Sequence, residues 1–376
     1  MELKEYRFDE VTINFDKKRV PLSGAQREKR QGNFRYYGAQ GVIDHIDDFI
    51  FDGTYLLIAE DGENLKSKKQ NIAQVVEGQF WVNNHAHIVQ GNELCNTRYL
   101  CYLLNSMDLS GYVTGSAQPK LSQANLNAVT LFLPSITVQE RIVECLYLFD
   151  KKIAVNQKIN DNLYAQAKAI FAQRFIGIET IPDGWKKGNL LDIANYLNGL
   201  AMQKFRPRDD EVGLPVLKIK ELRQGSCDVS SELCSPSIKP EYIVHDGDVI
   251  FSWSGSLLVD IWCGGTCGLN QHLFKVTSET YDQWFYYLWT AHHLERFIAI
   301  AADKATTMGH IKRGELEKAE VLIPSEKDYK EISSLMNPLF NLIIANRIEA
   351  RKLAELRDEL LPKLMSGEID VSEVSV

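Results

Sequence analysis

The feature of this sequence that most constrains its fold is an internal repeat that spans half of the chain. The run LSQANLNAVTLFLPS, residues 121–135, returns as IKRGELEKAEVLIPS, residues 311–325, after an interval of 190 positions. The two runs share few identities, but their apolar residues and the prolines Pro134 and Pro324 fall in step. A repeat of this length predicts two copies of one structural unit within the 376 residues.

After each proline the apolar pattern becomes helical. Its positions alternate steps of four and three for about four heptads, which is typical of a coiled-coil seam. The seam positions are Ile142, Leu146, Phe149, Ile153, Asn156, Asn160, Leu163, Ala167 and Ile170 in the first copy, and Ile332, Met336, Leu339, Ile343, Asn346, Ala350, Leu353, Arg357 and Leu360 in the second. We therefore expect each copy to end in a long amphipathic helix.

One polar residue recurs inside this seam, as Asn156 and as Asn346. Coiled coils use a buried Asn to fix register, because the amide costs stability unless it finds a partner. If the two helices pack antiparallel, we expect the two amides to pair with each other. The alternative is that each Asn lies at the solvated edge of the seam.

Upstream of each helix the sequence reads as short apolar strands broken by Gly, Asn and Asp, followed by an aromatic-rich helix. The expected strands lie in residues 34–45, 54–62 and 81–89, and again in 214–222, 247–255 and 268–276. The predicted fold class is α+β, with two mixed domains related by the repeat and two long helices that form an antiparallel coiled coil. We expect a first domain at 1–133, a helical spacer at 134–178, a second domain at 179–323 and a distal helical region at 324–376.

Composition and termini favour a cytoplasmic protein. The start of the chain has no apolar core behind a basic segment, and no window approaches the roughly 18 apolar residues of a membrane span. The seven cysteines have irregular spacings, which favours reduced thiols over a disulfide framework or a metal site.

The short motifs argue against catalysis by this chain. The segment GSAQPKLS lacks the ending that would place a lysine on a nucleotide phosphate. The segment NPLF at 337–340 imitates a methyltransferase signature, but it lies inside the second heptad run without a glycine-rich cofactor turn upstream. The N-x-H pair occurs twice, at Asn83 with His85 and at Asn270 with His272, and we interpret it as scaffolding. We expect no catalytic residue, no metal ligand and no cofactor.

Basic clusters are the better functional candidates, although the net charge is −8. Residues 16–35 carry seven basic and two acidic side chains, beside two tyrosines that could stack on bases. The candidates for DNA contact are Lys17, Lys18, Arg19, Arg27, Lys29, Arg30, Arg35, Tyr36 and Tyr37 in the first copy, and Lys204, Arg206, Arg208, Lys218, Lys220 and Arg223 in the second. The alternative is an ordinary solvated surface, because charge runs usually only solubilise a protein.

These segments together resemble the specificity subunits of type I restriction-modification systems. Residues 32–44, 51–65 and 80–89 look like the frame of one target recognition domain, and 181–195, 247–256 and 269–276 look like the second. Residues 133–158 and 323–371 look like the central and distal conserved helices of the family. The resemblance covers essentially the whole chain.

This resemblance implies two target recognition domains that each read half of a split, asymmetric sequence in double-stranded DNA. It also implies that the helices act as a spacer and bind other chains. Those partners would be modification subunits, most simply two, and restriction subunits. They would bind S-adenosylmethionine and ATP and carry out methylation, translocation and cleavage, so this chain would be non-catalytic.

The sequence departs from the family pattern at two places. The first domain begins near Tyr6 without the Pro-x-Gly-Trp opening found at 182–185, so the end of the chain is a candidate to complete its edge. Arg35 stands where the second copy keeps Pro215, which makes Arg35 a candidate DNA contact. Residues 179–323 carry 15 basic and 20 acidic side chains, the balance least suited to binding DNA.

Two other classes of function remain open on the sequence. A tandem-repeat adaptor would join protein complexes without contacting DNA, and steeply salt-dependent binding to duplex DNA would exclude it. A self-contained methyltransferase would have to bind its cofactor without a partner chain.

Overall fold

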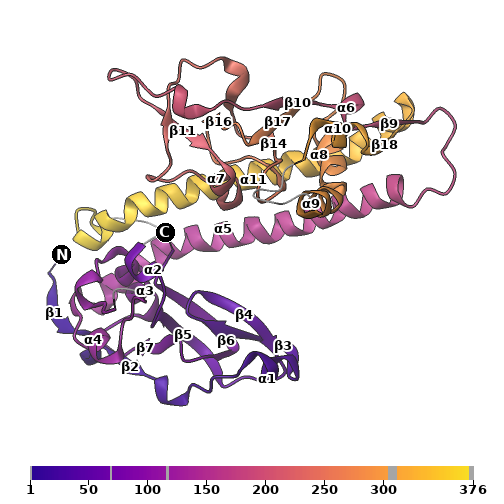
Figure 1. Ribbon diagram of the computed structural model, residues 1–376. Helices are drawn as coiled ribbons and strands as arrows, with labels where there is room; N and C mark the ends of the chain where they lie inside the picture. Colours follow the sequence, from indigo (N-terminus) through magenta and orange to yellow (C-terminus); the bar gives the residue numbers. More distant parts are fainter. Residues whose placement is uncertain (1, 68–69, 116–117, 304–310, 372–376) are drawn as a thin grey trace. The chain divides into compact units, whose positions relative to one another are not determined.

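The structure is a computed structural model, and it describes residues 2–67, 70–115, 118–303 and 311–371 (Figure 1). The chain divides into two compact units. Unit 1 consists of Met1–Asp150 and Glu355–Val376, and unit 2 of Lys151–Ala354. The boundary falls inside both long helices, α5 (Ile136–Phe171) and α11 (Glu326–Ser366), so each unit contains part of each helix.

Unit 1 is built around a six-stranded mixed sheet with the order β2-β7-β5-β6-β3-β4. The bounds are Thr12–Asn14 for β2, Gln31–Gly38 for β3, Gly41–Ile46 for β4, Phe51–Ala59 for β5, Ala73–Val82 for β6 and Ala86–Gly91 for β7. Within this sheet β3 and β6 pair in parallel, and the other neighbouring strands pair antiparallel. The helix α3 (Thr97–Ser106) packs on β5, β6 and β7, because its apolar face carries the buried Tyr99, Leu100 and Leu104.

Unit 1 also contains short helical elements. They are η1 (Phe8–Glu10), η2 (Asp16–Lys18), α1 (Gly24–Glu28), α2 (Asn64–Ser67), η3 (Ser110–Tyr112) and α4 (Gln123–Asn127). A separate ribbon pairs β1 (Lys4–Arg7) with β8 (Thr130–Leu133) in antiparallel register. Of these two strands, β8 lies directly before α5 in the chain.

The C-terminal segment completes the core of unit 1. Leu364 and Val371 are buried in the same apolar cluster as Leu131 and Leu146, and Leu361 packs against it. A polar contact reinforces this closure, because Arg357 and Tyr102 both donate hydrogen bonds to the carboxylate of Asp150. The C-terminal segment thus forms part of the core of unit 1, as the sequence suggested for the edge of the first domain.

Unit 2 contains two four-stranded sheets and a two-stranded ribbon. The first sheet has the order β10 (Asn195–Asn198), β17 (Leu273–Thr277), β14 (Val249–Ser252) and β15 (Leu258–Ile261). The second has the order β12 (Leu233–Cys234), β11 (Leu214–Leu217), β16 (Cys267–Leu269) and β13 (Ile243–Val244). The ribbon pairs β9 (Lys186–Asn189) with β18 (Glu320–Ile323), as β1 pairs with β8 in unit 1.

The helices of unit 2 carry most of its aromatic core. The helix α8 (Gln283–His292) buries Trp284, Phe285 and Trp289, which pack with Phe171 and Phe175 near the end of α5. The remaining elements are η4 (Ala172–Ile176), α6 (Leu190–Ile193), η5 (Met202–Lys204), α7 (Ile219–Gln224), η6 (Pro240–Tyr242), α9 (Leu294–Asp303) and α10 (Arg313–Glu317).

Within unit 2 the two long helices run antiparallel, as the magenta and yellow ribbons of Figure 1 show. Asn156 donates a hydrogen bond to Glu349 (2.6 Å), and Arg174 reaches Glu331 (3.4 Å). Asn346 donates to Asn160 (2.9 Å). Both recurring asparagines are buried. The predicted pairing of Asn156 with Asn346 is wrong, because Asn346 faces Asn160, one helical turn beyond Asn156 on α5.

Most predicted elements are confirmed, including both long helices and the mixed domains upstream of them. Two details differ. The strand expected at 214–222 is shorter, because β11 ends at Leu217 and α7 follows it. Glu221 caps this helix by accepting a hydrogen bond from the backbone N–H of Lys218 (3.2 Å). The helix α11 runs through Pro338 without interruption. The predicted division at 133, 178 and 323 stays a prediction.

The N-x-H pairs have a structural role in both units. Asn83 accepts a hydrogen bond from the backbone N–H of His85 (2.8 Å), and Asn270 accepts from that of His272 (3.3 Å). Each Asn therefore stabilises the turn that leads into the next strand, β7 or β17.

Candidate nucleic-acid interface

The basic segment of unit 1 contains a short loop held by an anchor at each end. Lys17 and Lys18 lie in η2 with exposed side chains, and Asp16 and Arg19 flank them. The carboxylate of Asp16 accepts from the backbone N–H of Ile88 (2.8 Å) and contacts the ring of His87 (2.6 Å). The two lysines are thus presented to solvent from a fixed backbone.

Arg19 forms the second anchor. Its guanidinium donates to the carboxylate of Glu60 (2.9 Å) and to the carbonyl of Ala86 (2.8 Å), and it lies 3.4 Å from Asp16. Only 15% of the side chain is exposed. Its role as a DNA contact stays a prediction, while most of its donors are already engaged inside the protein.

The carboxyl groups of this anchor remain ionised at neutral pH. Burial raises the pKa of Asp16, but hydrogen bonds from His87 and Ile88 and the charges of His87 and Arg19 outweigh it, so the pKa is lowered. For Glu60, burial likewise raises the pKa, and Arg19, His87 and Lys120 together lower it below its ordinary value.

The other arginines of this segment are also paired. Arg27 donates to Asp44 (2.8 Å) and Arg30 to Asp47 (2.9 Å). Their guanidinium groups lie over the rings of Tyr36 and Trp81, at 5.2 and 5.0 Å from the ring centres. The charges of these two arginines are therefore paired with carboxylates on β4 and directly after it.

The predicted stacking of bases on Tyr36 and Tyr37 is wrong. Their exposed fractions are 0% and 4%, because both rings belong to apolar clusters of unit 1. The hydroxyl of Tyr36 accepts from the backbone N–H of Leu22 (2.8 Å), while burial raises the pKa of Tyr37. Arg35 covers the Tyr37 ring and donates to the carbonyl of Glu77 (2.7 Å), yet remains exposed.

The cluster of unit 2 is largely neutralised by acidic neighbours. Lys218 (2.6 Å) and Arg206 (3.4 Å) both pair with Glu232. Lys220 pairs with Asp228 (3.2 Å), and hydrogen bonds within that loop and from Lys220 hold the pKa of Asp228 well below its usual range. Among the described residues, the exposed side chains of Lys204, Arg208 and Arg223 lie outside these ion pairs.

Two apolar residues at the surface of unit 2 were not singled out from the sequence. Val212 and Val229 have exposed fractions of 89% and 109%, more than any other large apolar residue in the described part of the chain. Val212 lies in the loop before β11, between Arg208 and Lys218, and Val229 lies in the loop after α7, beside Asp228. A methyl-bearing side chain on a loop among cations can contact the methyl group of thymine in a DNA groove.

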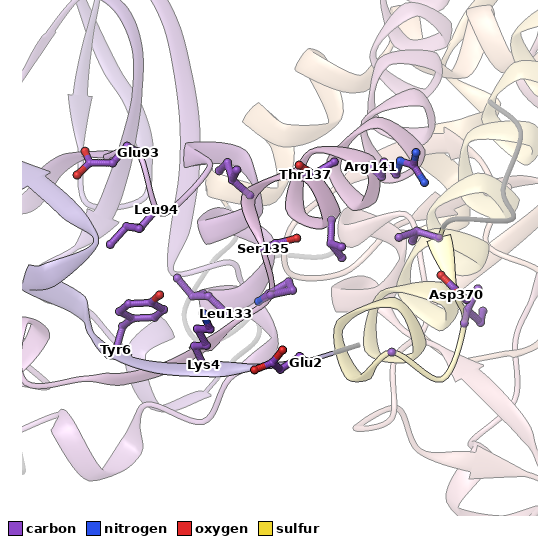
Figure 2. Close-up of a pocket in the computed structure, with 16 residues that line it drawn as sticks. Glu2, Lys4, Tyr6, Glu93, Leu94, Leu133, Ser135, Thr137, Arg141 and Asp370 are labelled. Carbon is purple, nitrogen blue, oxygen red and sulfur yellow. The ribbon is translucent and has the colours of Figure 1, made fainter.

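A pocket of about 650 Å³ opens in unit 1 where the C-terminal segment meets the start of α5. Figure 2 shows Lys4 and Tyr6 on β1, Arg141 on α5 and Asp370 on the C-terminal segment. The residues that line the pocket include acidic side chains, Glu2, Glu93 and Asp370, and basic side chains, Lys4 and Arg141. This mixture does not favour phosphate over a cation.

The described residues contain no group of three or more His, Cys, Asp or Glu side chains placed to hold a metal ion. All seven cysteines are free thiols. No helix in the described ranges is both long and apolar enough to span a membrane.

Comparison with known proteins decides the family. The family model for the type I restriction modification DNA specificity domain matches twice, over residues 2–165 and 182–357, which together form most of the chain. The chain belongs to this family. It is a type I specificity subunit, the component that recognises the DNA sequence, and it is not a catalytic subunit.

Relatives of this specificity subunit carry the same description. The MjaIX specificity subunit of Methanocaldococcus jannaschii is 28% identical over 307 residues, which are 74% of this chain and 70% of that protein. The EcoBI specificity subunit of Escherichia coli is 22% identical over 211 residues, 54% of this chain and 43% of that protein.

A solved structure supports the fold. The type I restriction-modification S subunit of M. genitalium aligns with a TM-score of 0.60 at 12% identity, covering 97% of this chain and 96% of that one. At this identity the likeness extends to the fold. The α+β class, the repeated domain and the long helices predicted from the sequence are confirmed.

Proposed function

We propose that this specificity subunit reads a bipartite, asymmetric sequence in double-stranded DNA, one half with each mixed domain. The observation that carries the proposal is the duplication of the specificity domain, with exposed basic loops in both copies. Two copies that differ in sequence present different side chains, so each copy would select its own half-site.

The division of labour among side chains follows from their environment. Lys17, Lys18 and Lys29 are exposed and would neutralise phosphates, with Arg35 beside them. In unit 2, Lys204, Arg208 and Arg223 would do the same. Because these are few charges on an acidic protein, we expect tight binding only in the assembled complex.

Catalysis would belong to partner chains. We infer that the long helices dock two modification subunits, which bind S-adenosylmethionine and methylate adenine, and that restriction subunits using ATP join them. The complex would act in the cytoplasm, where the chromosome is. The coiled-coil register in unit 2 supports this role, since fixed helices would set the spacing between half-sites.

The test is to co-express the chain with a modification subunit encoded beside it and to map adenine methylation on a plasmid by single-molecule sequencing. A two-part motif with a fixed gap is expected. The variant Lys17→Glu/Lys18→Glu should abolish methylation at that motif, because it reverses two charges on the loop.

The matched control is Lys186→Glu/Lys187→Glu, an equal charge change on two adjacent exposed lysines of β9. It should leave the motif and its methylation unchanged. Methylation of a continuous motif would contradict the bipartite model, and assembly without DNA binding or methylation would favour the adaptor function.

A further inference from the structure

His87 occupies an unusual place in unit 1. It lies on β7 with 1% of its side chain exposed, and both ring nitrogens contact oxygen atoms. Nδ1 is 2.6 Å from a carboxylate oxygen of Asp16, and Nε2 is 2.8 Å from the backbone carbonyl of Leu121. These contacts join three segments: η2, β7 and the stretch just before α4, at Leu121.

The carbonyl of Leu121 can only accept a hydrogen bond, so Nε2 must carry a proton. An ionised carboxylate also only accepts, so Nδ1 must carry one as well. The other oxygen of Asp16 already accepts from Ile88, and Arg19 lies 3.4 Å from the carboxylate, which favours the ionised form. With protons on both nitrogens, the ring is a cation.

The charges around His87 are compatible with a buried cation. Glu60, at the end of β5, lies 3.9 Å from Nδ1 and also pairs with Arg19 and with Lys120 (3.3 Å). Two carboxylates therefore face the imidazole, and both are bridged by basic groups. A buried charge that is paired and fully hydrogen-bonded avoids most of the cost of leaving water.

We propose that His87 is a buried imidazolium that positions the Lys17–Lys18 loop for contact with DNA phosphates. Asp16 begins the turn that carries the two lysines, so the His87–Asp16 contact fixes the backbone from which they extend. The DNA part of this inference rests on the proposed function, and the charge state of His87 does not. Neither His87 nor Asp16 contacts DNA itself.

The chain offers a matched control in His85, two residues earlier. Its Nδ1 lies 2.7 Å from the carboxylate of Asp61, much like the contact of His87 with Asp16. However, its side chain is 52% exposed, and no second acceptor faces its ring among the described residues. A carboxylate contact alone is therefore present at both positions, whereas the second acceptor distinguishes His87.

The first measurement is nitrogen NMR of the full chain labelled with 15N-histidine, at about pH 8, above the ordinary pKa of a free histidine near 6.5. Both ring nitrogens of His87 should give the signals of N–H groups. His85, whose ring faces one carboxylate and no second acceptor among the described residues, gives the comparison signal within the same chain. Assignment uses His87→Gln or, if that variant is unstable, Gln variants at the other histidines.

A bare Nδ1 on His87 would overturn the charge assignment, because it would mean that the shared proton lies on Asp16. This result needs no DNA, so it is independent of whether the chain binds a duplex.

The second measurement is the salt dependence of duplex binding by the complex with the modification subunit. Loss of two phosphate contacts reduces the steepness of log K against log[salt] by about two. The drop in affinity between 50 and 200 mM salt should then be roughly ten-fold smaller than in the wild type. We expect Lys17→Gln/Lys18→Gln to cause this loss. His87→Gln and Asp16→Asn should each reproduce most of it, and His85→Gln should not.

Combining the variants separates positioning from general destabilisation. In a His87→Gln background, the two lysine substitutions should cause almost no further loss, because the loop no longer presents them. Additive losses would overturn the positioning role. If the wild-type complex does not bind duplex DNA at all, the proposed function fails together with the positioning role, while the NMR result stands.

Discussion

At the scale of single residues, Lys18 and Arg19 show how neighbours in one basic cluster acquire different roles. A guanidinium has five donors in a planar fork and can satisfy several acceptors at once, whereas a lysine ammonium is more strongly hydrated. Arg19 accordingly contacts Glu60 and Ala86, which lie 41 and 67 positions away. The sequence predicts the cluster, but it cannot predict this division, because the acceptors come from distant strands.

Packing against distant residues also explains why the predicted stacking of bases on Tyr36 is wrong. In the sequence it follows Arg35 and looks like part of an exposed basic and aromatic surface. In the structure the side chain of Tyr36 lies on the buried face of β3, where it packs with Ile46 and Trp81. Strand periodicity alone cannot say which face is buried, since that depends on the packing partner.

The first prediction at this scale concerns Arg19. Replacing it by Lys removes the hydrogen bonds that join the loop to β5 and β7. We expect the free energy of unfolding of unit 1 to fall by about 1–3 kcal/mol. Lys18→Met, which leaves these contacts intact, should change it by less than about 0.5 kcal/mol. Urea denaturation measures both, and equal effects of the two substitutions would contradict the anchor role.

The second prediction concerns acid stability. The pKa of Asp16 is lowered from 3.8 in the folded protein, so its stabilising contribution is complete above about pH 4 and is lost as the pH falls through the folded value. Wild type should therefore be more stable than Asp16→Asn at pH 6, and the difference should shrink on acidification. Urea denaturation at several pH values tests this, and a difference that stays constant would argue against it.

At the scale of elements, the heptad pattern predicts both long helices well, because the apolar stripe of a helix can be read from its own sequence without knowing what it packs against. The partner of each asparagine was not predictable. Equivalent positions in a repeat need not face each other when two helices run antiparallel. Asn346 therefore meets Asn160, four residues beyond Asn156 on α5.

The third prediction follows from this pair. Asn346→Leu removes the donor to Asn160 and should lower stability by about 1–2 kcal/mol, because a partly buried amide loses its partner. The double variant Asn160→Leu/Asn346→Leu should recover that loss, since it replaces both polar groups by apolar ones. A double-mutant cycle from thermal unfolding gives the coupling energy, which should be close to zero if the observed register is wrong.

At the scale of the whole molecule, unit 1 is assembled from two stretches that lie far apart in the sequence. The absent Pro-x-Gly-Trp opening and the family resemblance point to the C-terminal end as a candidate. Neither indicates that Leu364 and Val371 enter the core, because the residues after the heptad run have no regular apolar period.

The fourth prediction tests this closure. Leu364→Ala should destabilise unit 1 by about 2–5 kcal/mol, the usual cost of a cavity in a core. Hydrogen exchange should rise in β5, β6 and α3 of unit 1, while β14 and β17 of unit 2 stay protected. The control is Leu356→Ala on the same helix, where 44% of the side chain is exposed, and little change is expected there. Uniform loss of protection in both units would contradict the two-unit description.

The two-part construction of unit 1 also sets an order of events during synthesis. Translation completes domains from the N-terminus in most proteins, so the first to emerge is usually the first to fold. Here the core of unit 1 lacks Leu364 and Val371 until all of unit 2, which lies in one continuous stretch before them, has been synthesised. We therefore expect unit 1 to finish folding after unit 2, with the apolar residues that contact Leu364 and Val371 uncovered in the nascent chain.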